Sequence, residues 1–231
     1  MEAKYFLPKM EIKKNNLIPE IILIDKPKGI SSFDVIRRLR KKYGVKKMGH
    51  SGTLDPLATG LMIIGINKGT KKLNKLIKLP KIYEATILLG KKTATGDMEG
   101  KILEEKKISK IDVTQVKKVL KIMNGKIVLP VPFYSAVKIS GKPLYKLARQ
   151  GKTGITLPKK QMEIFWLKLK KHFREENYYL LQIELKVASG TYVRSIAEEI
   201  GHRLNLPATV KELRRTKIGE FKVENAERLS N

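Results

Sequence analysis

Cysteine is absent from this chain of 231 residues, and only three histidines are present, His50, His172 and His202. The absence of cysteine excludes disulfide bonds, thiolate nucleophiles and thiolate metal ligands. No two of the histidines have a spacing that would place them together on one helix face as metal ligands. We therefore expect no zinc site.

Long hydrophobic runs are also absent, and no stretch approaches the roughly eighteen uncharged apolar residues that a membrane-spanning helix requires. Residues 1–15 lack the apolar core and the small-residue cleavage site of a signal peptide. Both absences predict a cytoplasmic protein without membrane contact. No internal repeat, low-complexity run or linker divides the sequence. We predict a single domain over residues 1–231, a length that allows a substantial core.

Acidic residues are few relative to basic ones: 22 Asp and Glu stand against 49 Lys and Arg, which gives a formal net charge of +27. Solvation of helix faces explains some of these lysines. A folded cytoplasmic protein this basic most plausibly binds a polyanion. The basic residues are spread along the chain rather than collected in a tail, which favours a broad positive surface on a folded domain. RNA or DNA is the expected class of partner.

The hydrophobic pattern predicts strands and helices in mixed order. A strand over residues 20–25 precedes a helix from Ser31 to about Tyr43, in which Ser31 and Asp34 hold capping-box positions. Further helices are predicted over residues 69–79, 112–124, 142–150 and 194–204, and further strands over 61–66, 81–89, 126–129, 161–173, 178–187 and 220–223. Residues 90–100 read as a polar loop. Hairpins with inserted helices indicate an α+β fold with a mixed, mainly antiparallel central sheet flanked by helices and loops.

The stretch from Gly49 to Gly60, GHSGTLDPLATG, is the most informative one in the sequence. Glycine allows backbone angles that other residues avoid, and Pro56 biases Asp55 away from helical angles. The segment therefore forms a shaped loop that presents His50 and Asp55 beside a buried strand. Loops on rigid elements often carry function, but an aspartate in such a turn most often bonds only its own backbone.

The same twelve residues resemble the catalytic motif of the TruB-type tRNA pseudouridine synthases. Other segments resemble that family in the same order, at residues 25–32, 81–83, 132–138, 145–151, 190–194 and 213–216. This ordered set, between about residues 20 and 225, is far more specific than a lone Asp-Pro loop. The resemblance implies the pseudouridine synthase catalytic fold and an isomerase that converts the uridine at tRNA position 55, in the T-arm loop, to pseudouridine.

The resemblance also implies three catalytic residues. Asp55 matches the essential aspartate, which acts on the uridine to start cleavage of the glycosidic bond, either through a C1′ adduct or through a glycal-type route. Tyr83 matches the tyrosine that stacks on the flipped base and is implicated in taking the C5 proton. Arg194 matches the arginine that pairs with the aspartate, and such a partner would keep Asp55 ionised at neutral pH.

Four further residues match substrate-binding positions of the family. His50 matches the histidine of the RNA-facing pocket, Tyr192 and Leu213 match other pocket residues, and Lys26 lies in a supporting motif. The isomerisation needs neither a metal nor a cofactor, and we expect none. The basic loop over residues 151–160 is expected to clamp the T arm of tRNA, with the protein acting as a monomer.

Two other functions stay open from the sequence. The motif around Asp55 also resembles that of the guide-RNA-dependent pseudouridine synthases, although residues 57–60 argue against that group. An RNA-binding or tRNA-folding protein that does not depend on catalysis is the third reading. Many family members continue into a C-terminal PUA domain, and we expect none in this chain because too few residues follow the matched segments.

Overall fold

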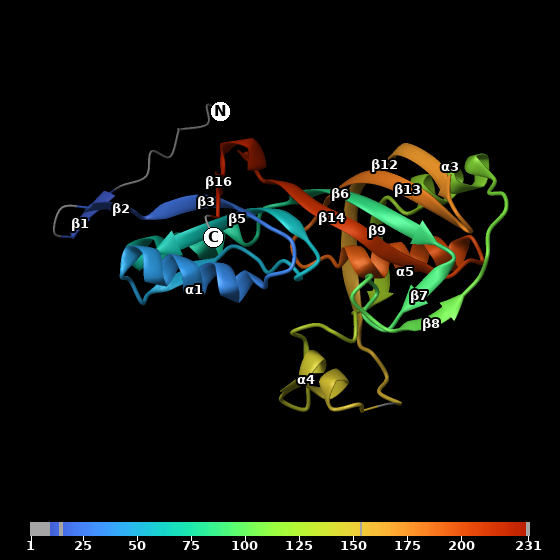
Figure 1. Ribbon diagram of the computed structural model, residues 1–231, viewed down its shortest axis with the longest axis horizontal. Coiled ribbons are helices and arrows are strands. Elements are labelled where there is room, and N and C mark those ends of the chain that lie inside the picture. Colours follow the sequence, from blue (N-terminus) through green and yellow to red (C-terminus); the bar gives the residue numbers. More distant parts are fainter. Residues whose placement is uncertain (1–9, 14–15, 153, 230–231) are drawn as a thin grey trace. The chain divides into compact units, whose positions relative to one another are not determined.

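The computed structural model describes residues 10–13, 16–152 and 154–229 (Figure 1). The chain divides into two compact units. Unit 1 comprises Met1–Lys81 with Arg214–Asn231, and unit 2 comprises Ile82–Leu213. Strand β14 (Ala208–Ile218) crosses the boundary along the chain, so each unit contains a part of it. The single domain expected from the sequence stays a prediction.

Unit 1 is built on a mixed sheet in which the strands follow the order β16-β3-β5-β14. Strand β3 runs antiparallel to β5, whereas the pairs β5–β14 and β16–β3 are parallel. Strand β4 also pairs with β5, β15 pairs with β14, and β1 pairs with β2 in a separate hairpin. The strands of this unit are β1 (Met10–Lys13), β2 (Asn16–Pro19), β3 (Ile21–Lys26), β4 (Met48–His50), β5 (Thr59–Ile66), β15 (Phe221–Lys222) and β16 (Glu227–Arg228).

Helix α1 (Ser32–Tyr43) has the predicted capping box. The Ser31 hydroxyl accepts a hydrogen bond from the Asp34 amide, and the Asp34 carboxylate accepts one from the Ser31 amide at 2.8 Å. The helix ends at Gly44, whose φ of 63° is a left-handed conformation that glycine adopts without strain. The local sequence alone therefore sets both ends of α1.

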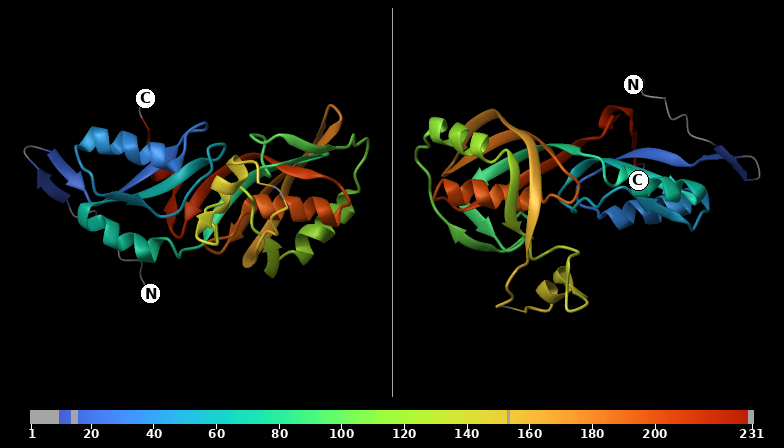
Figure 2. Two further views of the ribbon diagram at one scale, coloured as in Figure 1. Left: turned by 90° about the horizontal axis from the view of Figure 1, so that it is seen from below. Right: turned by 180° about the vertical axis from the view of Figure 1, so that it is seen from behind.

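Strand β5 is buried along almost its whole length, because apolar groups cover both of its faces. Leu61 and Ile63 pack with Ile218, Val223 and residues of the 67–79 segment. Figure 2 shows α1 on one side of the unit 1 strands and the short helices η1 (Asn67–Lys72) and α2 (Leu73–Leu76) on the other. The predicted helix over 69–79 is thus a 3₁₀ turn followed by one turn of α-helix. The loop that precedes β5 is therefore joined to a rigid, buried strand.

Unit 2 contains a sheet with the strand order β14-β6-β13-β12-β9. Its strands β6 (Lys81–Leu89), β9 (Gly125–Pro130), β12 (Lys159–Glu175) and β13 (Tyr178–Val187) all overlap predicted strands. Strand β12 is antiparallel to both of its neighbours. Helix α3 (Val113–Ile122) packs against β12, and α5 (Val193–Arg203) packs against β9. The predicted α+β class with a mixed, mainly antiparallel sheet is confirmed.

The long strand β14, shared by both units, was not predicted. The short elements of unit 2 that were not predicted are β7 (Lys91–Thr93), β8 (Ile102–Glu105), β10 (Lys138–Ile139) and β11 (Lys142–Pro143). Strand β7 lies inside the predicted polar loop over residues 90–100, so that part of the prediction was wrong. Helix α4 (Leu144–Arg149) lies within the predicted helix over 142–150. The 3₁₀ turn η2 (Val223–Asn225) belongs to unit 1.

Two absences hold for the described residues. None of their helices is long and apolar enough to cross a membrane. Within the same ranges no three side chains of His, Asp or Glu gather as a metal ion would need. The expectation of an enzyme without metal or cofactor stays a prediction.

Candidate active site

Lys26 fixes the backbone beside Asp55. Its side chain is fully buried, and its Nζ donates hydrogen bonds to the carbonyl oxygens of Ile30 at 2.7 Å, Pro27 at 2.9 Å and Pro56 at 3.3 Å. A buried ammonium group is costly unless it is hydrogen-bonded, and these carbonyls satisfy it. Because Pro56 directly follows Asp55, Lys26 ties the turn after β3 to the candidate catalytic residue.

Ser32 holds the residue on the other side of Asp55. Its hydroxyl donates to the carbonyl oxygen of Leu54 at 2.9 Å and accepts from the Leu54 amide at 2.7 Å. The Ala58 amide donates to the Asp55 carbonyl at 3.0 Å and closes the turn. Asp55 itself is partly exposed. The two neighbours of Asp55 are therefore both bonded to the segment that joins β3 to α1.

Arg215 of β14 secures the two ends of the same loop. Only 1% of its surface is exposed; its Nε donates to the Leu61 carbonyl at 2.7 Å, and its guanidinium also donates to the Gly52 carbonyl at 3.1 Å. Gly60 is required for this approach, because its φ is +105° and a Cβ there would lie 2.3 Å from the Arg215 carbonyl oxygen. The loop is consequently enclosed by β5 and β14.

His50 is a neutral side chain at the start of this loop. Burial lowers the pKa of its imidazole, and the positive charge of Arg215 lowers that pKa further. Its Nδ1 accepts a hydrogen bond from the Gly52 amide at 3.3 Å, which requires that this nitrogen carry no proton. The structure therefore brings together Lys26, His50 and the Asp55 loop within unit 1.

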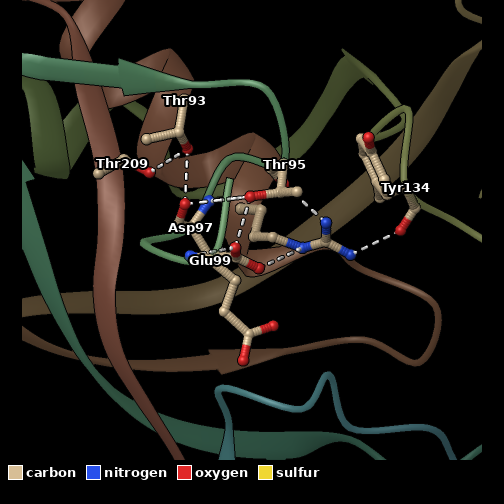
Figure 3. A network of polar contacts seen from close by, with 7 residues as sticks. Thr93, Thr95, Asp97, Glu99, Tyr134 and Thr209 are labelled. Atoms are coloured by element: carbon tan, nitrogen blue, oxygen red, sulfur yellow. Dashed lines mark hydrogen bonds and ion pairs between the residues drawn. The ribbon is translucent and has the colours of Figure 1, made fainter. Parts of the chain in front are cut away.

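Arg194 is held at the centre of a polar network in unit 2. Its guanidinium donates to the carbonyl oxygens of Thr95 at 2.7 Å and Tyr134 at 3.0 Å, and its Nε lies 4.0 Å from Asp97 Oδ2 (Figure 3). The other Asp97 oxygen accepts from the Thr95 hydroxyl at 2.5 Å and from the Glu99 amide at 3.1 Å. Arg194 and Asp97 are both almost fully buried.

Asp97 is a functional candidate that was missed in the sequence analysis. Residues 90–100 were interpreted only as a polar loop, although Thr95, Gly96 and Asp97 form a compact polar turn. The turn is locked: Thr93 donates to the Asp97 carbonyl at 2.6 Å, and Gly96 has a positive φ of 75°. The polar side chains of this turn were the signal that could have pointed to Asp97. The partner of Asp97, Arg194, lies 97 residues later in the sequence.

The other predicted site residues also belong to unit 2. Tyr83 on β6 and Leu213 on β14 are each 8% exposed. Tyr192 precedes the first turn of α5, and the Lys160 Nζ lies 5.8 Å from the centre of its ring. Together with Arg194 these residues stand on β6, β14 and α5. That the unit 2 residues meet Asp55 of unit 1 stays a prediction.

Comparison with known proteins gives consistent matches along the chain. The family model described as TruB family pseudouridylate synthase (N terminal domain) matches residues 40–193. A protein named tRNA pseudouridine synthase B, from Endomicrobium trichonymphae, is 38% identical over 218 residues, which are 94% of this chain and 92% of that protein. Its namesake from Mycobacterium bovis (strain BCG / Pasteur 1173P2) is 36% identical over 213 residues, 92% of this chain and 71% of that protein.

Solved structures agree on the fold. A chain of a Cbf5-Nop10-Gar1 complex has a TM-score of 0.68 and 26% identity over 90% of this chain, which corresponds to 52% of that chain. A chain of an H/ACA RNP bound to a substrate RNA containing 2'-deoxyuridine has a TM-score of 0.65 and 22% identity, covering 96% of this chain and 59% of that one. This protein spans between half and two thirds of those chains. With a family model that covers most of the sequence and relatives that match nearly all of it, the chain belongs to the TruB family of pseudouridylate synthases.

Proposed function

We propose that this protein is a stand-alone tRNA pseudouridine synthase that isomerises the uridine at position 55, in the T-arm loop. The observation that carries the proposal is the Asp55 loop: it has the family's sequence, and Lys26, Ser32 and Arg215 hold its backbone. Such fixed geometry is what a catalytic carboxylate needs, because small displacements of a reacting group cost large factors in rate. The relatives named tRNA pseudouridine synthase B support tRNA as the substrate.

The reaction breaks the C1′–N1 bond of uridine, rotates the uracil and joins C1′ to C5. The target base must first leave its stack and enter a pocket. Asp55 acts on the flipped nucleotide to start the cleavage. Tyr83 stacks on the base and takes the proton that C5 loses, while N1 gains a proton from solvent. Tyr192 and Leu213 retain the detached uracil, and His50 shapes the entry of the RNA.

Arg194 supplies a fixed positive charge for Asp55. Two carbonyl oxygens and the Asp97 carboxylate hold its guanidinium, so little reorganisation is needed when a second carboxylate approaches. An arginine beside Asp55 favours the ionised form of that carboxyl group and so lowers its pKa. The net charge of +27 attracts the tRNA backbone, and the segment over residues 151–160, which ends in the first two residues of β12, clamps the T arm. We expect a monomer that acts in the cytoplasm.

Primer extension on an unmodified tRNA transcript, after carbodiimide treatment, tests the reaction and its position together. Wild-type protein is expected to produce a stop at the T-loop uridine, and Asp55→Asn is expected to produce none. Glu220→Gln is the control, since it also removes one carboxylate from unit 1, an exposed one, and should retain the stop. The absence of a stop with wild-type protein, or an undiminished stop with Asp55→Asn, contradicts the proposal.

A guide-RNA-dependent synthase is the second candidate, and the fold similarity to a chain of the Cbf5-Nop10-Gar1 complex is the observation that favours it. Activity of the purified protein alone on tRNA excludes a need for a guide RNA. A tRNA-folding function is separable from catalysis, because Asp55→Asn protein should then accelerate tRNA refolding as well as wild-type protein does.

A further inference from the structure

The outer side of α1 carries an exposed aromatic ring beside the Asp55 loop. The apolar residues Val35, Ile36 and Leu39 of this helix are buried, as an amphipathic helix on a sheet requires. Phe33 departs from this pattern, because 60% of its surface is exposed. A single exposed apolar residue needs no explanation by itself. The basic residues around Phe33 make it a candidate for binding.

Five basic residues of α1 lie outside its buried face: Arg37, Arg38, Lys41 and Lys42 are exposed like Phe33, and Arg40 is half-buried. Arg37 pairs with Asp34, and Lys42 lies 3.7 Å from Glu227. In the part of the chain that the structure describes, no carboxylate pairs with the other three. An ordinary solvated helix face interleaves both signs of charge, whereas this one retains three cations available for an external anion.

Arg40 is arranged against the ring of Phe33. The centre of its guanidinium lies 5.8 Å from the ring centroid, within the range of a cation–π contact. Its Nε is enclosed and has no hydrogen-bond partner among the described residues. One side of the helix carries Phe33 at position i, Arg37 at i+4, Arg40 at i+7 and Lys41 at i+8. An aromatic ring and guanidinium groups along one line match the chemistry that binds unpaired bases and their phosphates.

The same helix turn is bonded to the candidate active site. Ser32, the residue before Phe33, exchanges two hydrogen bonds with Leu54, which precedes Asp55. Helix α1 and the Asp55 loop both belong to unit 1, and Figure 2 shows the outer side of α1 uncovered by other elements of that unit. Phe33 is therefore the direct neighbour of a residue that is bonded to the Asp55 loop.

We propose that Phe33, Arg40 and Lys41, with Arg38 on the adjoining exposed side of the helix, form an RNA-binding surface, called here the α1 face. In it an unpaired base of the substrate RNA stacks on Phe33, and the adjoining phosphates pair with the three cations. The inference rests on the proposed function for the identity of the RNA. It adds a binding surface to the predicted site residues, and it assigns a stacking role to a side chain outside the matched family motifs.

Direct binding measurements with a catalytically inactive protein test the α1 face. Each variant is made in the Asp55→Asn background, and the Kd for unmodified tRNA is measured by filter binding over a range of salt concentrations. Phe33→Ala is expected to raise the Kd by about fivefold or more, the effect of losing one stacked base. Phe33→Trp should restore tight binding, which a role limited to helix folding would not require. The double variant Arg38→Gln/Lys41→Gln should lower the slope of log K against log salt by about 1.4 to 1.8.

Lys106→Gln/Lys107→Gln is the charge-matched control, since both lysines are exposed in unit 2 and the change should leave the slope within experimental error. Replacement of Phe33 by a photo-crosslinking phenylalanine analogue should label an unpaired nucleotide of the tRNA. If all α1-face variants bind tRNA as the Asp55→Asn parent does, the inference is overturned and the face serves another partner. If the Asp55→Asn parent binds tRNA through the α1 face but wild-type protein forms no pseudouridine, the proposed reaction is refuted and the proposed RNA-binding surface is supported.

Discussion

Arg194 and Asp97 form a buried ion pair between α5 and the turn that follows β7, with 4.0 Å between Arg194 Nε and Asp97 Oδ2. The pair lies entirely within unit 2, and backbone carbonyls of Thr95 and Tyr134 accept the remaining hydrogen bonds described for the guanidinium. Asp97 thus neutralises a cation that would otherwise be expensive to bury. It also fixes the direction in which that cation faces.

Asp97→Asn should therefore weaken both the fold and the reaction. Removal of the Asp97 charge takes this ion pair from buried Arg194, with Glu198 as a further carboxyl group acting on it, and should lower the free energy of unfolding by about 3 kcal/mol. Pseudouridine formation should fall further than the unfolded fraction explains, because Arg194 loses its orientation. Urea titration and single-turnover tritium release measure the two effects. Glu104→Gln, an exposed carboxylate of β8, is the control, and a fully active Asp97→Asn enzyme would refute the positioning role.

Lys26→Met should disturb the turn at Asp55. The methionine fits a similar volume but cannot donate to the carbonyls of Pro27, Ile30 and Pro56. Because these bonds are only partly buried, water can replace some of them, and the total cost is that of about one unsatisfied buried group. We expect a loss of about 2 kcal/mol in unfolding free energy, together with a fall in kcat. Lys28→Met, two residues away and exposed, should stay within about 0.5 kcal/mol of wild type. Equal effects of the two substitutions would contradict the anchoring role.

Lys81 should make the stability depend on pH in the alkaline range. Burial lowers the pKa of its ammonium group from 10.5 to about 8, and Arg215 contributes to the shift. Between these two values the unfolded chain binds a proton at Lys81 that the folded protein does not, so the unfolding free energy contributed by this group rises with pH from about 8 to 10.5. Urea unfolding at several pH values measures the rise, which should be smaller in Lys81→Met and unchanged in Lys78→Met, an exposed neighbour. A wild-type slope in Lys81→Met would contradict the assignment.

Gly60→Ala should separate β5 from β14. A Cβ at Gly60 would lie 2.3 Å from the Arg215 carbonyl oxygen, whereas a Cβ at Gly44 would meet nothing within 4 Å, and both glycines have positive φ. Gly44→Ala should then cost about 1 kcal/mol for the backbone conformation alone. Gly60→Ala should cost about 2 kcal/mol more, because the strands must move apart. Chemical unfolding of the two variants is the measurement, and equal losses would contradict the close approach.

The sequence was most informative where the signals are local. Helix α1 follows from Ser31, Asp34 and Gly44, whose capping roles depend only on near neighbours. Strand β6 was predicted with its observed bounds, Lys81–Leu89, because its apolar residues alternate over nine positions. By contrast, β7 and β10 have three and two residues, too few for any period to appear.

The site was predicted less completely because its contacts join distant parts of the chain. The family resemblance pointed to Asp55, Tyr83 and Arg194, but nothing local to Arg194 indicates that Asp97 is its partner. Lys26 was expected to lie in a supporting motif, and its role stays a prediction; its bonds to Pro27, Ile30 and Pro56 could not be read from its local sequence. Arg215 lies in the matched segment 213–216 but was not singled out, since its role depends on the parallel pairing of β14 with β5.

Arg215 has a consequence for the order of events during synthesis. The loop that carries Asp55 acquires its Lys26 and Ser32 hydrogen bonds from residues translated before it, but its bond from Arg215 to Gly52 spans 163 residues of sequence. Because domains are synthesised from the N-terminus, the loop cannot reach its final form until Arg215 has left the ribosome. A nascent chain therefore carries an incompletely bonded Asp55 loop until Arg215 has been translated, although Lys26 and Ser32 are already in place.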